Sequence, residues 1–124
     1  MVGIVTGGGG VEMFPNGRWR GWWEQGLLGR HWMDPLELHS QGNRIWGEGQ
    51  DVVGPFTFNG SRDATGMVRL EKQYLNQHAV SYVGRFEGEG VIVGYWNIAN
   101  LGSGRFALIP SSELARDMPI AEIS

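Results

Sequence analysis

From residue 17 to residue 110 the chain alternates apolar and polar side chains in short runs that end at Gly, Asn or Asp. A period of two is typical of β-strands with one buried face, and closely spaced turn signals favour an antiparallel sandwich or barrel. No stretch of this region has a convincing helical period. The pattern predicts eight strands, at residues 17–24, 32–40, 44–51, 55–61, 67–75, 78–87, 91–98 and 103–110.

The connections between these runs are short, and short connections force neighbouring strands to pair antiparallel in sequence order. Eight such strands can close on themselves and remove both sheet edges, so the sequence predicts an all-β, eight-stranded antiparallel up-and-down β-barrel. Residues 17–110 form the predicted barrel domain. A flexible lead-in is predicted for residues 1–16, whose four-glycine run lacks the Lys-Ser/Thr pair of a phosphate loop. A C-terminal tail is predicted for residues 111–124, starting as a helical turn capped by Ser111 or Ser112.

Composition limits the classes of function. A chain of 124 residues with 41% hydrophobic residues fits one packed domain, and a net charge of −3 disfavours a nucleic-acid binder. The chain has no cysteine, which excludes disulfides and thiolate chemistry. The N-terminal residues lack a basic segment followed by an apolar run, and no run approaches the roughly 20 apolar residues of a membrane helix. We therefore expect a cytoplasmic protein without a nucleic-acid or membrane partner.

Several motifs occur in a characteristic order: Gly17-Arg18-Trp19, the segment NRIWGEGQDVVG at 43–54, Tyr74-x-Asn76-x-His78, Tyr82 with Gly84, and an apolar run that ends at Trp96. This order resembles the avidin/streptavidin-like (calycin-type) small β-barrels. The resemblance implies an avidin- or lipocalin-like barrel with a cup that is open at one end. Residues 47–56, Gly-x-Gly-x-Asp-x-x-Gly-Pro-Phe, also resemble an element of small bacterial barrels of unknown function.

The biotin site of that family does not carry over to this chain. The third-strand Tyr and Ser that the family offers to biotin fall on Gly49 and Asp51, and a fifth-strand Trp falls on Leu70. The sixth-strand Ser and Thr fall near Ala79 and Val80. A site that hydrogen-bonds a ureido group loses heavily when these partners vanish. We therefore expect a different cargo or a filled lumen.

Strand parity predicts which side chains face the interior. The predicted cup has walls of Trp19, Trp23, Phe56, Phe58, Leu70, Tyr82 and Trp96. The predicted polar groups that orient a ligand are Asp51, Lys72, Tyr74 and His78. The same polar groups can instead form a buried network that fixes strand register, since a buried Asp51 would need a partner such as Lys72. One bulge would invert the face of a whole strand, and Pro35 is tolerated only at an edge or beside a bulge.

The function most consistent with this pattern is binding of a small, partly apolar molecule in the cup. One alternative is a barrel enzyme of the cyclase or isomerase type, with acid/base work by Asp51, His78, Lys72 or Tyr74. Another is a structural or protein-interaction barrel with a filled lumen. The sequence gives no sign of a cofactor, and its three histidines lack metal-ligand spacing. Outward-facing Trp22, Trp46 and Tyr95 favour a homo-oligomer, a dimer or a tetramer.

Overall fold

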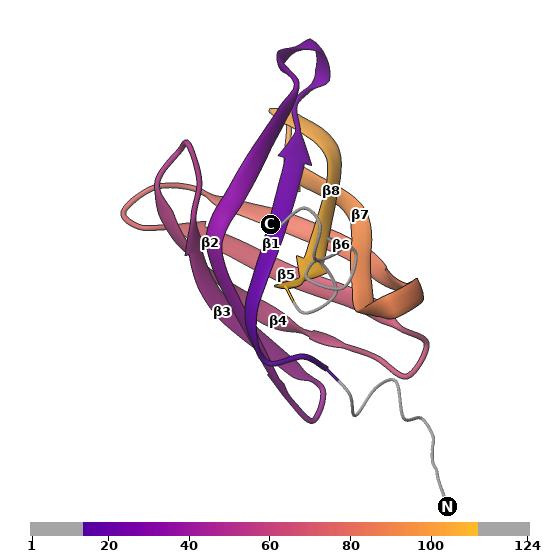
Figure 1. Ribbon diagram of the computed structural model, residues 1–124. Coiled ribbons are helices and arrows are strands. Elements are labelled where there is room, and N and C mark those ends of the chain that lie inside the picture. Colours follow the sequence, from indigo (N-terminus) through magenta and orange to yellow (C-terminus); the bar gives the residue numbers. More distant parts are fainter. Residues whose placement is uncertain (1–13, 112–124) are drawn as a thin grey trace, which may run out of the picture.

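The computed structural model describes residues 14–111, and eight antiparallel strands close into one barrel (Figure 1). Each strand pairs with its neighbours in sequence, and the first strand pairs with the last. The strands are β1 (Gly17–Glu24), β2 (Arg30–Gln41), β3 (Arg44–Gln50), β4 (Pro55–Arg62), β5 (Met67–Tyr74), β6 (Ala79–Glu87), β7 (Val91–Ile98) and β8 (Gly102–Pro110). Two 3-10 turns, η1 (Gly26–Leu28) and η2 (Gly88–Gly90), lie between strands. The prediction of an eight-stranded up-and-down barrel is confirmed.

The first two strands contain the bulge that Pro35 indicates. Trp19 pairs with Leu36 and Gly21 pairs with Met33, so two residues of β2 lie opposite Arg20. The extra residue lets Met33 as well as Leu36 point inward, because the bulge resets the alternation. Met33 and Leu36 are therefore both buried, and the proline lies within the bulge, where no ladder hydrogen bond is needed.

Side chains fill the interior of the barrel. Trp19, Phe58 and Lys72 have no exposed surface, and Tyr82 and Phe106 are exposed by 2% or less. Several inward positions are glycine because the backbone of the neighbouring strand comes close to them. A Cβ at Gly60 would meet the carbonyl of Arg69, and one at Gly94 would meet that of Val83. Large rings on some strands thus pack against glycine on others, which is how a small barrel fills its lumen.

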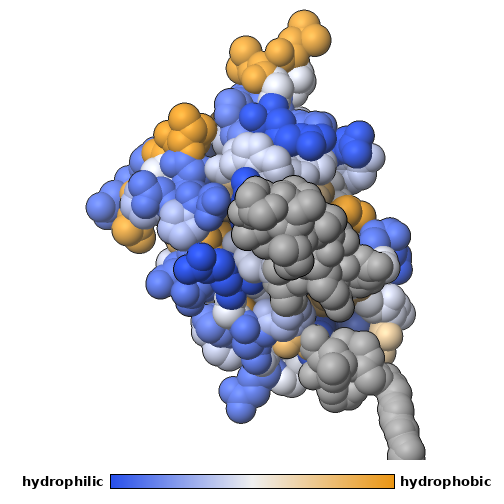
Figure 2. Space-filling view, in the orientation of Figure 1, coloured by the Kyte–Doolittle hydropathy of each residue, from blue (hydrophilic) through white to orange (hydrophobic). Residues whose placement is uncertain are grey.

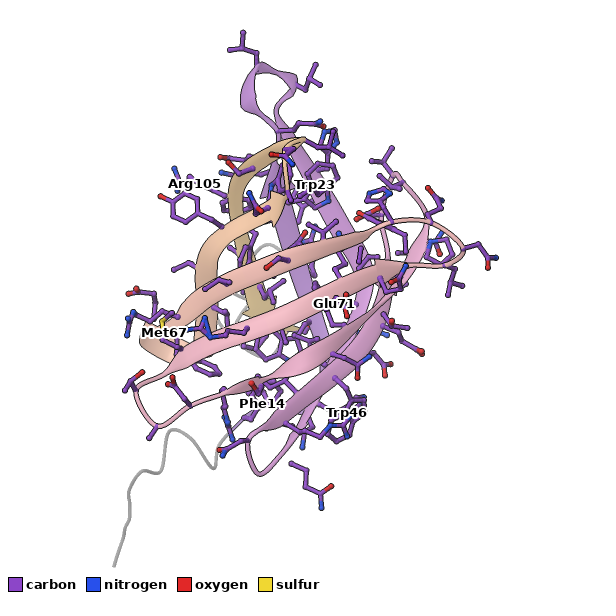
Figure 3. The ribbon with its side chains drawn as sticks, turned by 180° about the vertical axis from the view of Figure 1, so that it is seen from behind. Phe14, Trp23, Trp46, Met67, Glu71 and Arg105 are labelled. Atoms are coloured by element: carbon purple, nitrogen blue, oxygen red, sulfur yellow. The ribbon has the colours of Figure 1, made fainter. Side chains whose placement is uncertain are left out.

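The two ends of the barrel differ. At the end where β1 begins, Phe14 packs on Trp19 at 5.2 Å and on Phe86 at 6.3 Å between ring centroids, beneath the guanidinium of Arg62. The indole N–H of Trp19 donates to the Pro15 carbonyl at 2.7 Å. We call this the closed end. At the other end are the connections 25–29, 51–54, 75–78 and 99–101, which we call the loop end. Figure 3 shows Trp23 near the loop end and Phe14 near the closed end.

The helical content of the described residues is confined to short turns. No helix among residues 14–111 is long and apolar enough to cross a bilayer. Residues 112–124 of the predicted C-terminal tail lie outside the described part of the chain. The lead-in predicted for residues 1–16 likewise falls largely outside it.

Candidate functional site

The polar centre of the barrel is the carboxylate of Asp51, which follows β3 at the loop end. Its Oδ2 accepts hydrogen bonds from Lys72 Nζ at 2.7 Å, from the Tyr74 hydroxyl at 2.7 Å and from Trp23 Nε1 at 3.1 Å. Its Oδ1 accepts the backbone N–H of Val53 at 2.9 Å. Strands β1 and β5 and the β3–β4 loop thus meet at one side chain, which has no exposed surface. The predicted pairing of Asp51 with Lys72 is confirmed.

Lys72 is the only lysine in the sequence, and it lies inside the barrel. Its Nζ lies 4.3 Å from the centroid of the Phe56 ring, 4.8 Å from that of Tyr74 and 5.3 Å from that of Tyr82. It also donates to the Tyr82 hydroxyl at 3.2 Å. Aromatic faces attract a cation, and the carboxylate of Asp51 completes its neutralisation. An ammonium group is thereby held in a cage that is otherwise apolar.

Burial and pairing decide the charge of these groups. Burial raises the pKa of Asp51, but the charge and hydrogen bond of Lys72 and the hydroxyl of Tyr74 outweigh it and hold this pKa below its usual value. Burial lowers the pKa of Lys72 to about 8 against the opposing charge of Asp51. Burial and then the hydrogen bond to Asp51 raise the pKa of Tyr74, and burial raises that of Tyr82. At neutral pH the site contains a carboxylate, an ammonium and two neutral phenols.

These pKa shifts predict how stability depends on pH. The pKa of Asp51 is lower in the folded state, so its contribution is present above the unfolded value of 3.8 and is lost as pH falls through the folded value. Urea unfolding at pH 3 and pH 7 measures this trend.

The control for this experiment is the double variant Asp51→Asn/Lys72→Met, which has neither charge. Asp63 also has a lowered pKa, through its hydrogen bonds to Thr65 and Met67, and that contribution is present in both proteins. We therefore expect wild type to lose more stability than the double variant between pH 7 and pH 3. Equal losses in the two proteins would contradict the assignment of this pH dependence to the buried pair.

Two tryptophans cover the polar centre at the loop end. The Trp23 ring reaches from β1 to Asp51 and lies 4.4 Å from the ring of His31 and 5.9 Å from that of Trp96. Trp96 reaches from β7 across Gly104 of β8, and its Nε1 donates to the Glu24 carbonyl on β1 at 2.9 Å. A side chain at residue 104 would collide with this indole. Both rings are less than one-tenth exposed and lie at the loop end, and we call the pair the aromatic floor.

The predicted site residues fall into two groups. All of the predicted wall residues are buried, as are the side chains of Asp51, Lys72 and Tyr74. Trp19 and Phe58 have no exposed surface. His78 alone is exposed, at the rim, where its ring lies 5.1 Å from that of Tyr74. The structure thus brings the predicted set to the interior or the rim, and their role in ligand binding stays a prediction.

Sequence reasoning missed two members of this cluster. The ring of His31 lies against that of Trp23, but the predicted second strand begins at residue 32 and leaves His31 outside it. Phe106 contacts Tyr82 with ring centroids 4.6 Å apart, in a strand whose faces the alternation left unassigned. One signal that could have marked the centre is the use of arginine at every cationic position except residue 72.

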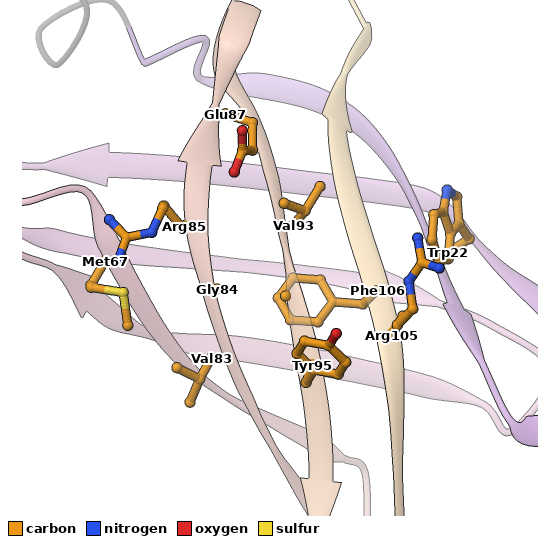
Figure 4. Close-up of a pocket in the computed structure, with 11 residues that line it drawn as sticks. Trp22, Met67, Val83, Gly84, Arg85, Glu87, Val93, Tyr95, Arg105 and Phe106 are labelled. Carbon is orange, nitrogen blue, oxygen red and sulfur yellow. The ribbon is translucent and has the colours of Figure 1, made fainter.

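The outer wall of the barrel has shallow grooves. One groove, of about 600 Å³, lies over β6, β7 and β8 and is lined in part by Gly84, Gly94 and the buried Phe106 (Figure 4). Arg85 and Arg105 are among its lining residues. The other described grooves are likewise lined largely by outward residues of the strands.

Arginines cover the outer tryptophans. The guanidinium groups of Arg30, Arg20 and Arg44 lie 3.7, 4.4 and 5.2 Å from the ring centroids of Trp22, Trp32 and Trp46. Cation–π stacking of this kind reduces the apolar area that a wall presents to a partner. Tyr95, which is 65% exposed, is the most open aromatic residue of the wall. Assembly through the outer wall stays a prediction.

The described residues contain no group of three or more His, Asp or Glu side chains that could hold a metal ion. The polar centre instead has one carboxylate and one ammonium, already paired with each other. The polar centre therefore offers charge, hydrogen-bond donors and a hydrogen-bond acceptor in an otherwise apolar environment.

The closed antiparallel barrel is compatible with a calycin-like fold. No protein-family model, curated protein or solved structure matches the chain.

Proposed function

We propose that the protein binds a small, partly apolar molecule at the loop end of the barrel, in a cup whose floor is Trp23 and Trp96. The observation that supports this most directly is the convergence of three donors on one oxygen of Asp51 beneath that floor. Ligand sites in barrels combine aromatic walls with a few convergent polar groups. A buried ion pair is a costly way to fill a core, which favours a role beyond packing.

In this proposal the ligand lies against the ring faces of Trp23 and His31, with His78 at the rim. Trp23 donates one hydrogen bond of 3.1 Å to Asp51, so a rotation of its indole would break one bond and uncover the polar centre. The Lys72 ammonium and the Asp51 carboxylate then offer a donor and an acceptor to the polar part of the ligand. The apolar part remains on the aromatic floor.

A second candidate is the barrel with a filled lumen that acts through its surface. The packing of the interior favours it, because Lys72, Phe58 and Trp19 leave no exposed surface inside. The two candidates differ in one respect: only the first needs the aromatic floor of the loop end for function.

A neutral fluorescent probe, N-phenyl-1-naphthylamine, tests the cup. We expect saturable binding of one probe per barrel, with quenching of tryptophan emission. Trp96→Ala should weaken binding roughly 10- to 100-fold, because truncation of a buried aromatic anchor removes most of its contact. The matched control is Trp46→Ala, since Trp46 stacks on His39 at the outer wall with ring centroids 5.8 Å apart.

The folded state of each variant is checked by its urea unfolding curve before titration. An absence of saturable binding to wild type contradicts the proposal. So does an equal loss of affinity in Trp46→Ala and Trp96→Ala, since the probe would then be bound at the wall or nonspecifically.

A further inference from the structure

The large hydrophobic side chains that are exposed on this barrel gather at its loop end. Leu27 is 104% exposed, Leu28 72%, Val52 74%, Val53 37%, Leu75 53% and Leu101 81%. These six occupy all four connections of the loop end, and the other two exposed large hydrophobic residues among the described ones, Trp32 and Tyr95, lie on strands. In Figure 2 apolar colour marks the tip of the β1–β2 hairpin, which projects beyond the barrel (Figure 1).

The same four loops have almost no charge. Their sequences are QGLLG, DVVG, LNQH and ANL, in which Asp51 is the one charged residue, and its side chain is buried and paired with Lys72. The nearest flanking charges, Glu24 and Arg30, neutralise each other at 2.8 Å. The solvent-facing surface of the loop end is therefore aliphatic and amide-rich.

The closed end provides an internal comparison. Its connections include or adjoin Arg44, Arg62, Asp63 and Glu87, and none of the exposed large hydrophobic residues of the described chain lies there. Turns of a barrel are thus not apolar by default in this molecule. The clustering at one end indicates a surface that is removed from water in use.

In place of the expectation that the protein has no membrane partner, we propose that the loop end docks on the surface of a lipid bilayer, with its aliphatic tips inserted between the headgroups of uncharged (zwitterionic) lipids. The tips stand on four separate loops, so a rigid partner would need four matching pockets, whereas a fluid interface accepts each side chain independently. The lack of an exposed cation in these loops and the net charge of −3 give no attraction to anionic lipids. Neutral lipid is therefore the partner that fits both the shape and the charge.

Two identical barrels meeting through this end fit less well. Each would present projecting tips to the other, and tip-to-tip contact does not build the continuous, well-packed area that a stable dimer interface has. The docking surface also stands apart from the floor of the cup. Leu27, Leu28 and Leu101 belong to the outer tips and are 72% or more exposed, whereas Trp96 is only 6% exposed.

Flotation of the full chain with phosphatidylcholine vesicles tests the proposal. We expect wild type to float with the vesicles, and Leu27→Asp/Leu28→Asp to reduce the bound fraction by about tenfold or more, since two exposed aliphatic groups are replaced by anionic ones. The matched control is Tyr95→Asp, which adds a charge at an exposed site on the wall and should float like wild type. Binding should persist in high salt, because no ion pair drives it.

Four results would overturn the proposal: wild type that stays in the soluble fraction, flotation only with phosphatidylserine vesicles, flotation of Leu27→Asp/Leu28→Asp at the wild-type level, or a lipid-free dimer that this variant abolishes, without flotation of wild type. The last result would identify a second copy as the partner. Trp96→Ala separates this proposal from the ligand cup, since it should lose probe binding and still float.

Discussion

Replacement of Lys72 by methionine is expected to lower the free energy of unfolding by about 3–5 kcal/mol, because it leaves the carboxylate of Asp51 buried without its cationic partner. Methionine matches the length of the lysine stem, so packing against Phe56 and Tyr82 is largely kept. The hydrogen bonds from Tyr74 and Trp23 remain, but they do not neutralise the charge. Urea unfolding at pH 7 measures the effect.

The double variant Asp51→Asn/Lys72→Met removes both charges and leaves an amide in place of the carboxylate. Replacement of a whole buried ion pair by neutral groups of similar shape is often neutral or stabilising. We therefore expect it to recover most of the stability that Lys72→Met loses, less the contribution of the ammonium to the aromatic cage. A double variant as unstable as the single one would contradict this account, since the loss would then come from packing at residue 72.

The double variant also separates structure from function. If the polar centre orients a ligand, a stable double variant should lose affinity for polar ligands of the cup while its barrel stays folded. If the pair serves only to fix strand register, stability and the probe titration should change together or not at all. Where a functional group lowers the stability of the fold, its replacement gives a variant that is more stable and less active.

The architecture could be predicted from the chain because two signals agree. The alternation around residues 67–75 and 78–87 has one unambiguous buried face on each strand, and the turns between runs leave no room for crossover helices. The single irregularity, opposite Arg20, falls where Pro35 indicates it. Strand parity therefore assigned the inward side chains correctly, and the pairing of Asp51 with Lys72 followed from that assignment.

The details of the site depend on closure, which local sequence does not encode. The hydrogen bond from Trp96 to the Glu24 carbonyl joins β7 to β1 across β8, and it exists only once the first and last strands pair. Whether the lumen is open or filled depends on the barrel radius and on the summed volume of side chains from all eight strands. The opposition of Phe106 to Gly84 and Gly94 is one such long-range match.

Trp19→Ala is the second change with a large expected effect, about 3–5 kcal/mol of lost stability. Trp19 has no exposed surface and lies at the closed end, against Phe14, with its N–H bonded to the Pro15 carbonyl at 2.7 Å. Truncation empties the space between the first strand and the segment that covers this end. It also leaves a carbonyl without its donor.

The comparison for Trp19→Ala is Trp46→Ala, since both remove an indole from a strand of the same barrel. Trp46 is half-buried on the outer wall, where water can occupy the space that its ring leaves, so we expect a loss of about 1 kcal/mol or less. Urea unfolding of both variants at pH 7 measures the difference. Equal losses would mean that the closed end is not packed as described. A large loss for Trp19→Ala alone means that the closed end supports the whole barrel, because a closed sheet has no free edge at which local unfolding could relieve a cavity.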